Sequence, residues 1–393
     1  MVSPIFAFGV VWIVQVLAYL VLPINLTLPA DATWLVVLTG FLSLTLGALV
    51  FSLASQLVME NRQINYIGVV KSSEVNLRLL YFSIFISAIT ALFLFLTIER
   101  NPIGFFLSIK ENILAESAAG YKFNTYLIYV FIYQVLLTLY YFNCNGFEKN
   151  SKTVFIFIAA ILSALMSGSR GLVVFFIIAL IPCIISKKHE VEINGKTFGK
   201  LLVIIIASFF IYPFLFQGMT IEGEGDYLKL SDYISTYLFS GITAFDDYLQ
   251  TNMPSYDCIL TIPRPLLSFV DTFWQSDLIA LCPSIYEEKL LPLPTNVYSI
   301  FFAPYHDFGL VGVGIYLFAI GYISQLSFTK GCLRNNDMWR FFYCILFYSL
   351  MLSFFEDQFS RGVIYYFFGF IVVISNRLAN IRLEILGIAN EKN

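Results

Sequence analysis

Runs of apolar residues long enough to cross a lipid bilayer recur along this chain. A helix needs about 20 mostly apolar residues to span roughly 30 Å of hydrocarbon. Segments of this kind, the last of them shorter, lie near residues 4–22, 34–57, 79–98, 124–142, 200–217, 302–326, 338–354 and 362–376. The pattern predicts an all-α polytopic integral membrane protein, with residues 1–393 forming a single transmembrane domain.

One further apolar stretch, residues 153–186, is too long for a single crossing, because a continuous helix of that length would measure about 50 Å. It is interrupted by "SGSRG" at residues 167–171. Two helices folded at this point give about ten spans, cytoplasmic termini, and 15 of the 23 Lys and Arg residues on the cytoplasmic side. One long helix would move ten of the last fourteen cations outside, against the positive-inside rule. We therefore predict a helical hairpin.

Composition agrees with this membrane assignment. Charged residues make up 12% of the chain, hydrophobic residues 59%, and the mean hydropathy is +0.79, whereas soluble domains carry about 25% charged residues. The net charge of −3 says little about partners, because charge is divided between the two sides of the membrane. We expect membrane lipids around the chain and no nucleic-acid partner.

The predicted topology sends one long loop, residues 217–297, to the outer face. Its sequence "YLKLSDYISTYLFSGITAFDDYL" has apolar residues at helical spacing, which predicts one or two amphipathic helices on the membrane surface and an ordered, partly helical cap. Cys258 and Cys282 both fall in this loop, and a disulfide between them stays open. The six cysteines show no metal-ligand spacing.

Charged or titratable side chains sit at the outer ends of the predicted spans. They are Arg170 in "SGSRG", Arg264 in "TIPRPLL", His306 and Asp307 in "PYHDFG", and Arg361 with Glu356 and Asp357 in "FFEDQFSRG". Arginine at membrane depth costs at least about 2.5 kcal/mol, so such residues are usually paired or functional. Each also has a plain structural interpretation: a turn residue at Arg170, an ion pair at Arg361, an interfacial side chain at His306.

Arginines at one face favour an anionic substrate, because a guanidinium binds phosphate oxygens in a planar, bidentate way. A lipid-linked diphosphate would meet the three arginines at this depth. Acidic clusters in the long loop offer a rival site for a divalent metal. One contains Glu222, Glu224 and Asp226, and the other contains Asp246 and Asp247. Acidic runs in loops are usually solvated, so we favour a site that uses neither metal nor cofactor.

Three stretches carry a resemblance to a known family. "SGSRG" between two short helices, "IPR" in a long outer loop, and "TNVYSIFFAPYHDFGLVGVGIYL" at the start of the next span resemble the bacterial O-antigen polymerases, or oligosaccharide repeat-unit polymerases. The resemblance implies a GT-C-like membrane glycosyltransferase in the bacterial inner membrane with a periplasmic active site. Its implied substrate is an undecaprenyl-diphosphate-linked oligosaccharide, and a chain-length regulator protein is an implied partner. The motif residues Arg170 and Arg264 would bind diphosphate or glycan.

The chemistry requires a proton acceptor. Arginines can stabilise a departing diphosphate, but the attacking sugar hydroxyl must lose its proton. His306 could accept it, with Asp307, Glu356 or Asp357 orienting the ring, and any of these carboxylates could be the base itself. Two other functions stay open: an O-antigen ligase, which uses the same donor, and a non-enzymatic flippase or exporter of lipid-linked oligosaccharide. The mid-span positions offer only uncharged polar residues such as Gln15 and Gln134, which favours a one-sided reaction over transport.

Overall fold

The computed structural model describes most of the predicted spans. It describes residues 2–21, 28–60, 75–97, 123–147, 150–168, 170–187, 230–251, 259–262, 289–290, 294–295 and 297–385. The predicted span at 200–217 lies outside these residues, as does most of the long loop.

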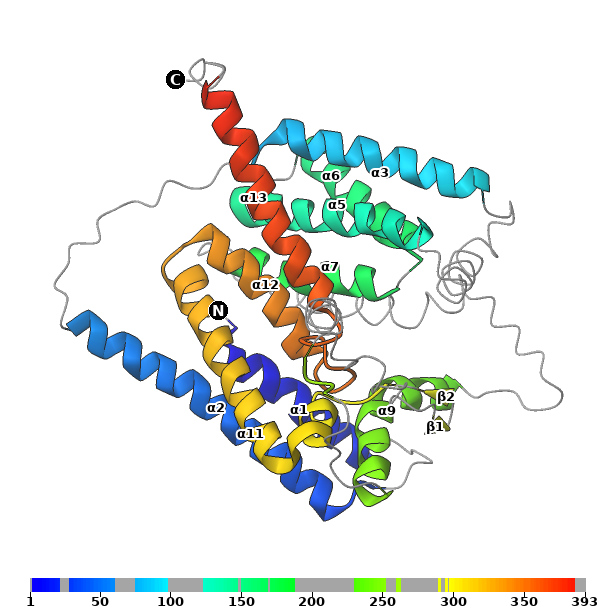
Figure 1. Cartoon of the computed structure of the whole chain (residues 1–393), viewed down its shortest axis with the longest axis vertical. Helices are drawn as coiled ribbons and strands as arrows, with labels where there is room; N and C mark the ends of the chain where they lie inside the picture. Colours follow the sequence, from blue (N-terminus) through cyan, green and yellow to red (C-terminus); the bar gives the residue numbers. More distant parts are fainter. Residues whose placement is uncertain are drawn as a thin grey trace, which may run out of the picture.

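Helices dominate the described structure (Figure 1). In chain order they are α1 (Pro4–Val21), α2 (Asp31–Glu60), α3 (Leu77–Thr97), α5 (Phe123–Asn145), α6 (Ser151–Met166), α7 (Arg170–Lys187), α9 (Leu230–Thr251), α11 (Phe302–Phe328), α12 (Asp337–Met351) and α13 (Val363–Ile385). A single π-helical turn, Thr329–Leu333, follows α11. Two-residue strands, β1 (Lys289–Leu290) and β2 (Pro294–Thr295), pair antiparallel before α11.

Five described helices are long and apolar enough to cross a membrane, over Asp31–Leu57, Leu77–Leu96, Tyr126–Asn145, Phe302–Leu333 and Val363–Ile381. Shorter apolar helices occupy Pro4–Tyr19, Ser151–Met166 and Gly171–Ile185. Large apolar side chains such as Val311 and Ile315 on α11 are exposed on the outside of the bundle, as expected for surfaces that face lipid. The prediction of a helical membrane protein is confirmed at this level, and the number of ten spans stays a prediction.

The predicted break at "SGSRG" is present. Helix α6 ends at Met166, Gly168 adopts the left-handed conformation with φ of 66°, and α7 begins at Arg170. The two helices pack on each other, with the rings of Phe157 and Phe176 5.8 Å apart. A left-handed residue ends a helix at little steric cost when it is glycine, which explains why the chain folds back here.

The helices form two hydrophobic clusters. One is built mainly by α3, α5, α6, α7, α12 and α13. The other joins α1, α2, α9 and α11 with the segment before α11. In Figure 1 the first group lies in the upper part of the view and the second group in the lower part. Helices α2 and α11 pack very closely, because a Cβ on Gly47 would lie 2.1 Å from the Phe318 carbonyl oxygen and one on Gly321 would lie 2.0 Å from that of Leu44.

The two ends of the bundle differ in charge. At one end, which we call the Arg340 end, the Tyr343 hydroxyl donates to the Val2 carbonyl (2.6 Å) and the Asn76 N–H donates to Asn376 (2.8 Å). The described elements place eight cations at or near this end: Arg78, Lys152, Lys187, Lys330, Arg334, Arg340, Arg377 and Arg382. At the opposite end, which we call the α9 end, α9 meets the start of α2, and the segment containing Arg361 connects α12 to α13.

Candidate functional site

Three segments meet at the α9 end. The Ser299 N–H donates to the Gly241 carbonyl in α9, and the Ile300 N–H donates to the Ser353 carbonyl after α12, both at 2.9 Å. Gly241 is pressed against that segment, since a Cβ there would lie 2.4 Å from the Phe354 carbonyl oxygen. Backbone contacts thus fix the region that contains "PYHDFG" and "FFEDQFSRG". The predicted amphipathic helix is present as α9, and its residues Phe239–Phe245 are buried against protein.

Helix α11 is broken near its start. Phe308 (φ −141°, ψ 16°) and Gly309 (φ 60°, ψ −150°) leave the helical conformation, so the turn Phe302–Asp307 is separate from the apolar helix that follows. The Gly309 conformation is nearly restricted to glycine. The turn lies close to the next one, because a Cβ on Gly312 would meet the Pro304 carbonyl oxygen at 2.3 Å. The span predicted at 302–326 is present as part of the apolar stretch Phe302–Leu333, and the break at Phe308 and Gly309 is a feature that the sequence did not predict.

The break places His306 and Asp307 inside the protein. Their exposed fractions are 3% and 1%. The His306 Nδ1 atom lies 2.9 Å from Asp307 Oδ1. The ring centroids of Tyr248 and Phe302 lie 6.0 and 6.1 Å from the centroid of the imidazole. Of the three carboxylates considered for orienting the ring, Asp307 is the one in contact with it.

Asp307 also binds a segment far away in the sequence. The Leu260 N–H donates to both carboxylate oxygens at 2.9 Å, and the Thr261 N–H donates to Oδ2 at 2.7 Å. The Thr261 hydroxyl donates to the same oxygen. Sequence reasoning missed this contact, because the partners are 46 and 47 residues apart and no local pattern signals it.

The neighbouring carboxylates Glu356 and Asp357 have other partners. Glu356 forms an ion pair with Arg361 and accepts a hydrogen bond from Gln358 at 2.7 Å. Asp357 is buried, and its oxygens accept from the Tyr316 hydroxyl at 2.8 Å and the Phe359 N–H at 3.0 Å. Burial raises the pKa of the Asp357 carboxyl to about 6, against the opposing effect of these hydrogen bonds. The ion pair with Glu356 supports the structural interpretation of Arg361.

Other predicted site residues are placed only in part. Arg170 is the first residue of α7, while its side chain, Arg264, Cys258, Cys282 and the acidic run at 222–226 lie outside the described residues. Asp246, one of the rival metal ligands, is buried. It accepts hydrogen bonds from the Ala30 N–H (2.8 Å), the Thr33 hydroxyl (2.6 Å) and Gln250 (2.8 Å). It therefore tethers α9 to the start of α2.

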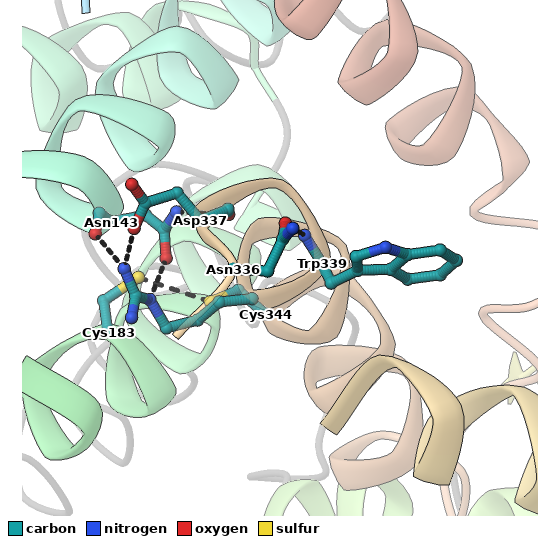
Figure 2. Close-up of polar contacts among 7 residues, drawn as sticks. Asn143, Cys183, Asn336, Asp337, Trp339 and Cys344 are labelled. Atoms are coloured by element: carbon teal, nitrogen blue, oxygen red, sulfur yellow. Dashed lines mark hydrogen bonds and ion pairs between the residues drawn. The ribbon is translucent and has the colours of Figure 1, made fainter. Parts of the chain in front are cut away.

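A second polar cluster lies at the Arg340 end, where the sequence indicated only a cytoplasmic cation. The Arg340 side chain is buried, donates to Asn143 Oδ1 at 2.7 Å and to the Asn143 carbonyl at 3.0 Å, and pairs with Asp337. Figure 2 shows this convergence, with Cys183 and Cys344 beside it, their sulfur atoms 3.3 Å apart. Asn336 caps α12 by accepting from the Trp339 N–H at 3.2 Å. These contacts join α5, α7 and α12.

Comparisons with known proteins identify no relative. No protein-family model, no curated protein and no solved structure matches this chain.

Proposed function

We propose that this chain is a glycosyltransferase that polymerises undecaprenyl-diphosphate-linked repeat units into a surface polysaccharide such as O-antigen. One observation carries the proposal. Thr261, which directly precedes the "IPR" stretch, is joined by hydrogen bonds at the α9 end to Asp307, which lies in another of the three stretches that resemble the polymerase family. A contact that brings the residue before one family-like stretch onto another supports a shared site more strongly than either stretch alone.

The proposed orientation places the α9 end in the periplasm and the Arg340 end in the cytoplasm. It is supported by the cations at the Arg340 end, because Lys and Arg are enriched on the cytoplasmic side of membrane proteins. The working membrane is then the bacterial inner membrane, with the site facing outward.

In the proposed reaction the acceptor sugar hydroxyl attacks the anomeric carbon of the donor glycan. A new C–O bond forms, and the bond from the anomeric carbon to the diphosphate breaks. Undecaprenyl diphosphate leaves with the electron pair, and arginines of the outer segments stabilise its charge. The hydroxyl proton passes to His306, whose ring Asp307 orients. His306 is buried in this conformation, so the residues around its ring must move before the acceptor can reach it.

The proposal is tested by deleting the gene and examining the surface polysaccharide. A polymerase deletion leaves a single repeat unit on the lipid core, and complementation with the intact gene restores long chains. Complementation with His306→Ala should leave single repeat units at normal protein level, because general base catalysis contributes about 10²–10⁴-fold. Loss of all glycan in the deletion strain would instead indicate a ligase or a flippase and would refute the polymerase assignment.

A further inference from the structure

Asp307 occupies an unusual position for a catalytic base. Both oxygens of its carboxylate are already engaged: Oδ1 by the Leu260 N–H and the His306 ring, and Oδ2 by the N–H groups of Leu260 and Thr261 and the Thr261 hydroxyl. The side chain is 1% exposed. An incoming sugar hydroxyl would have to displace one of these donors before it could transfer a proton to this carboxylate.

The same contacts suit a different task. Hydrogen bonds from N–H and O–H donors to an ionised carboxylate are among the strong ones, and they fix direction as well as distance. Residues 259–262 form no regular secondary structure, and Leu260 also packs against the hydrophobic cluster that includes α11. Through one carboxylate, the segment and the His306 ring are placed relative to each other.

We infer that Asp307 is a positioning residue that fixes the outer segment 259–262 on α11 and, through the same carboxylate, holds the His306 imidazole. It is not the proton acceptor. The anchoring itself is independent of the reaction, while its consequence for catalysis rests on the proposed function. The anchored segment includes Thr261 and Ile262, the first two residues of "TIPRPLL", and directly precedes Pro263 and Arg264 in the sequence.

Asp246 provides a matched control for Asp307. It is also a buried aspartate that accepts a backbone N–H and a threonine hydroxyl from a distant segment, here Ala30 and Thr33 before and within the first turn of α2. The same Asp→Asn change can therefore be made at two anchors that hold different segments. Any general effect of removing a buried carboxylate will appear in both variants, and a local effect in only one.

The test is amide hydrogen exchange of the full-length protein in lipid nanodiscs, read by mass spectrometry. In Asp307→Asn the amide offers one acceptor oxygen and turns its own N–H₂ toward the N–H donors. Peptides covering 259–262 should exchange at least about tenfold faster, which corresponds to about 1.4 kcal/mol, while those of α2 and α5 stay protected. Thr261→Val removes only the hydroxyl and should give a smaller increase. Asp246→Asn should increase the rate of amide exchange in residues 28–34 and leave the rate in residues 259–262 unchanged.

Steady-state kinetics with lipid-linked repeat units extracted from the deletion strain test whether Asp307 also acts as the catalytic base. If Asp307 positions the site, Asp307→Asn lowers kcat less than His306→Ala does, because the base is still present and only its orientation is lost. If it is the base, Asp307→Asn lowers kcat more than His306→Ala does, which overturns the inference that Asp307 is not the proton acceptor. Unchanged exchange in Asp307→Asn overturns it whatever the activity. Failure of the wild-type protein to extend chains, with exchange as expected, refutes the proposed function and leaves the anchor established.

Discussion

The buried carboxyl of Asp357 should make the stability of this protein depend on pH in a defined direction. Burial raises its pKa from 3.8 to about 6 in the folded state. A difference of about two pKa units corresponds to about 3 kcal/mol of free energy of unfolding. Because the folded pKa is raised, this stability is fully present below about pH 4, where the unfolded state also holds the proton. It is lost as the pH rises through about 6.

Asp357→Asn tests this magnitude. The asparagine cannot ionise, and it can accept from the Phe359 N–H while donating to the Tyr316 hydroxyl oxygen, as a protonated aspartic acid would. At pH 8 the variant should exceed the wild type by up to about 3 kcal/mol in free energy of unfolding. Near pH 4 the two should converge. Thermal unfolding of the purified protein in detergent, followed from pH 4 to pH 8, measures the difference.

Tyr316→Phe provides the opposing control. The Tyr316 hydroxyl donates to the Asp357 carboxylate and lowers its pKa, so its removal raises that pKa further. The phenylalanine variant should lose more stability than the wild type between pH 5 and pH 8. Parallel stability curves for wild type and Asp357→Asn across this range would refute the reasoning, because they would mean that the carboxyl ionises freely in the folded protein.

Two further substitutions test the α11 break and the cluster at the Arg340 end by the same unfolding measurement. Gly309→Ala should cost about 1–3 kcal/mol because alanine is strained at φ of 60° and ψ of −150°. Gly314→Ala is its control, since the added Cβ would meet only the Ser43 hydroxyl at an ordinary 3.7 Å; equal effects would mean that the break is not required. Arg340→Met should cost about 3–5 kcal/mol because it leaves the buried Asp337 carboxylate without its cation. The exposed Arg334→Met should stay near wild type, and a similar loss in both would contradict a specific buried pair.

Local chain chemistry accounts for the parts of the fold that the sequence predicted. Apolar runs located the described helices, and "SGSRG" located the turn between α6 and α7, because a glycine there can adopt the left-handed conformation. The amphipathic spacing of residues 227–249 found α9. In each case the residues that form the element are neighbours in the chain, although the charge count along the whole chain was needed to choose the hairpin at "SGSRG" over one long helix.

The features that the sequence did not predict depend on distant partners. Asp307 is satisfied by Leu260 and Thr261, and Arg340 by Asn143, which is 197 residues away. Charge counting treated Arg340 as one more cation at a helix end, because burial of a side chain is not visible in a count. Adjacent carboxylates, likewise, could not be assigned to His306 or to other partners until the backbone fixed their directions.

Charge at the α9 end bears on which arginine could bind an anionic substrate. Asp246, Asp307 and Asp357 are buried there and accept hydrogen bonds mainly from neutral N–H and O–H groups. A carboxylate satisfied in this way keeps its negative charge when ionised, so the region repels a diphosphate unless cations offset it. Arg361 is already paired with Glu356, and binding a diphosphate would have to compete with that pair. Under the proposed function, we therefore expect the offsetting positive charge from the arginines of "SGSRG" and "TIPRPLL", and Arg264 in the second run follows closely, in sequence, the segment that Asp307 contacts.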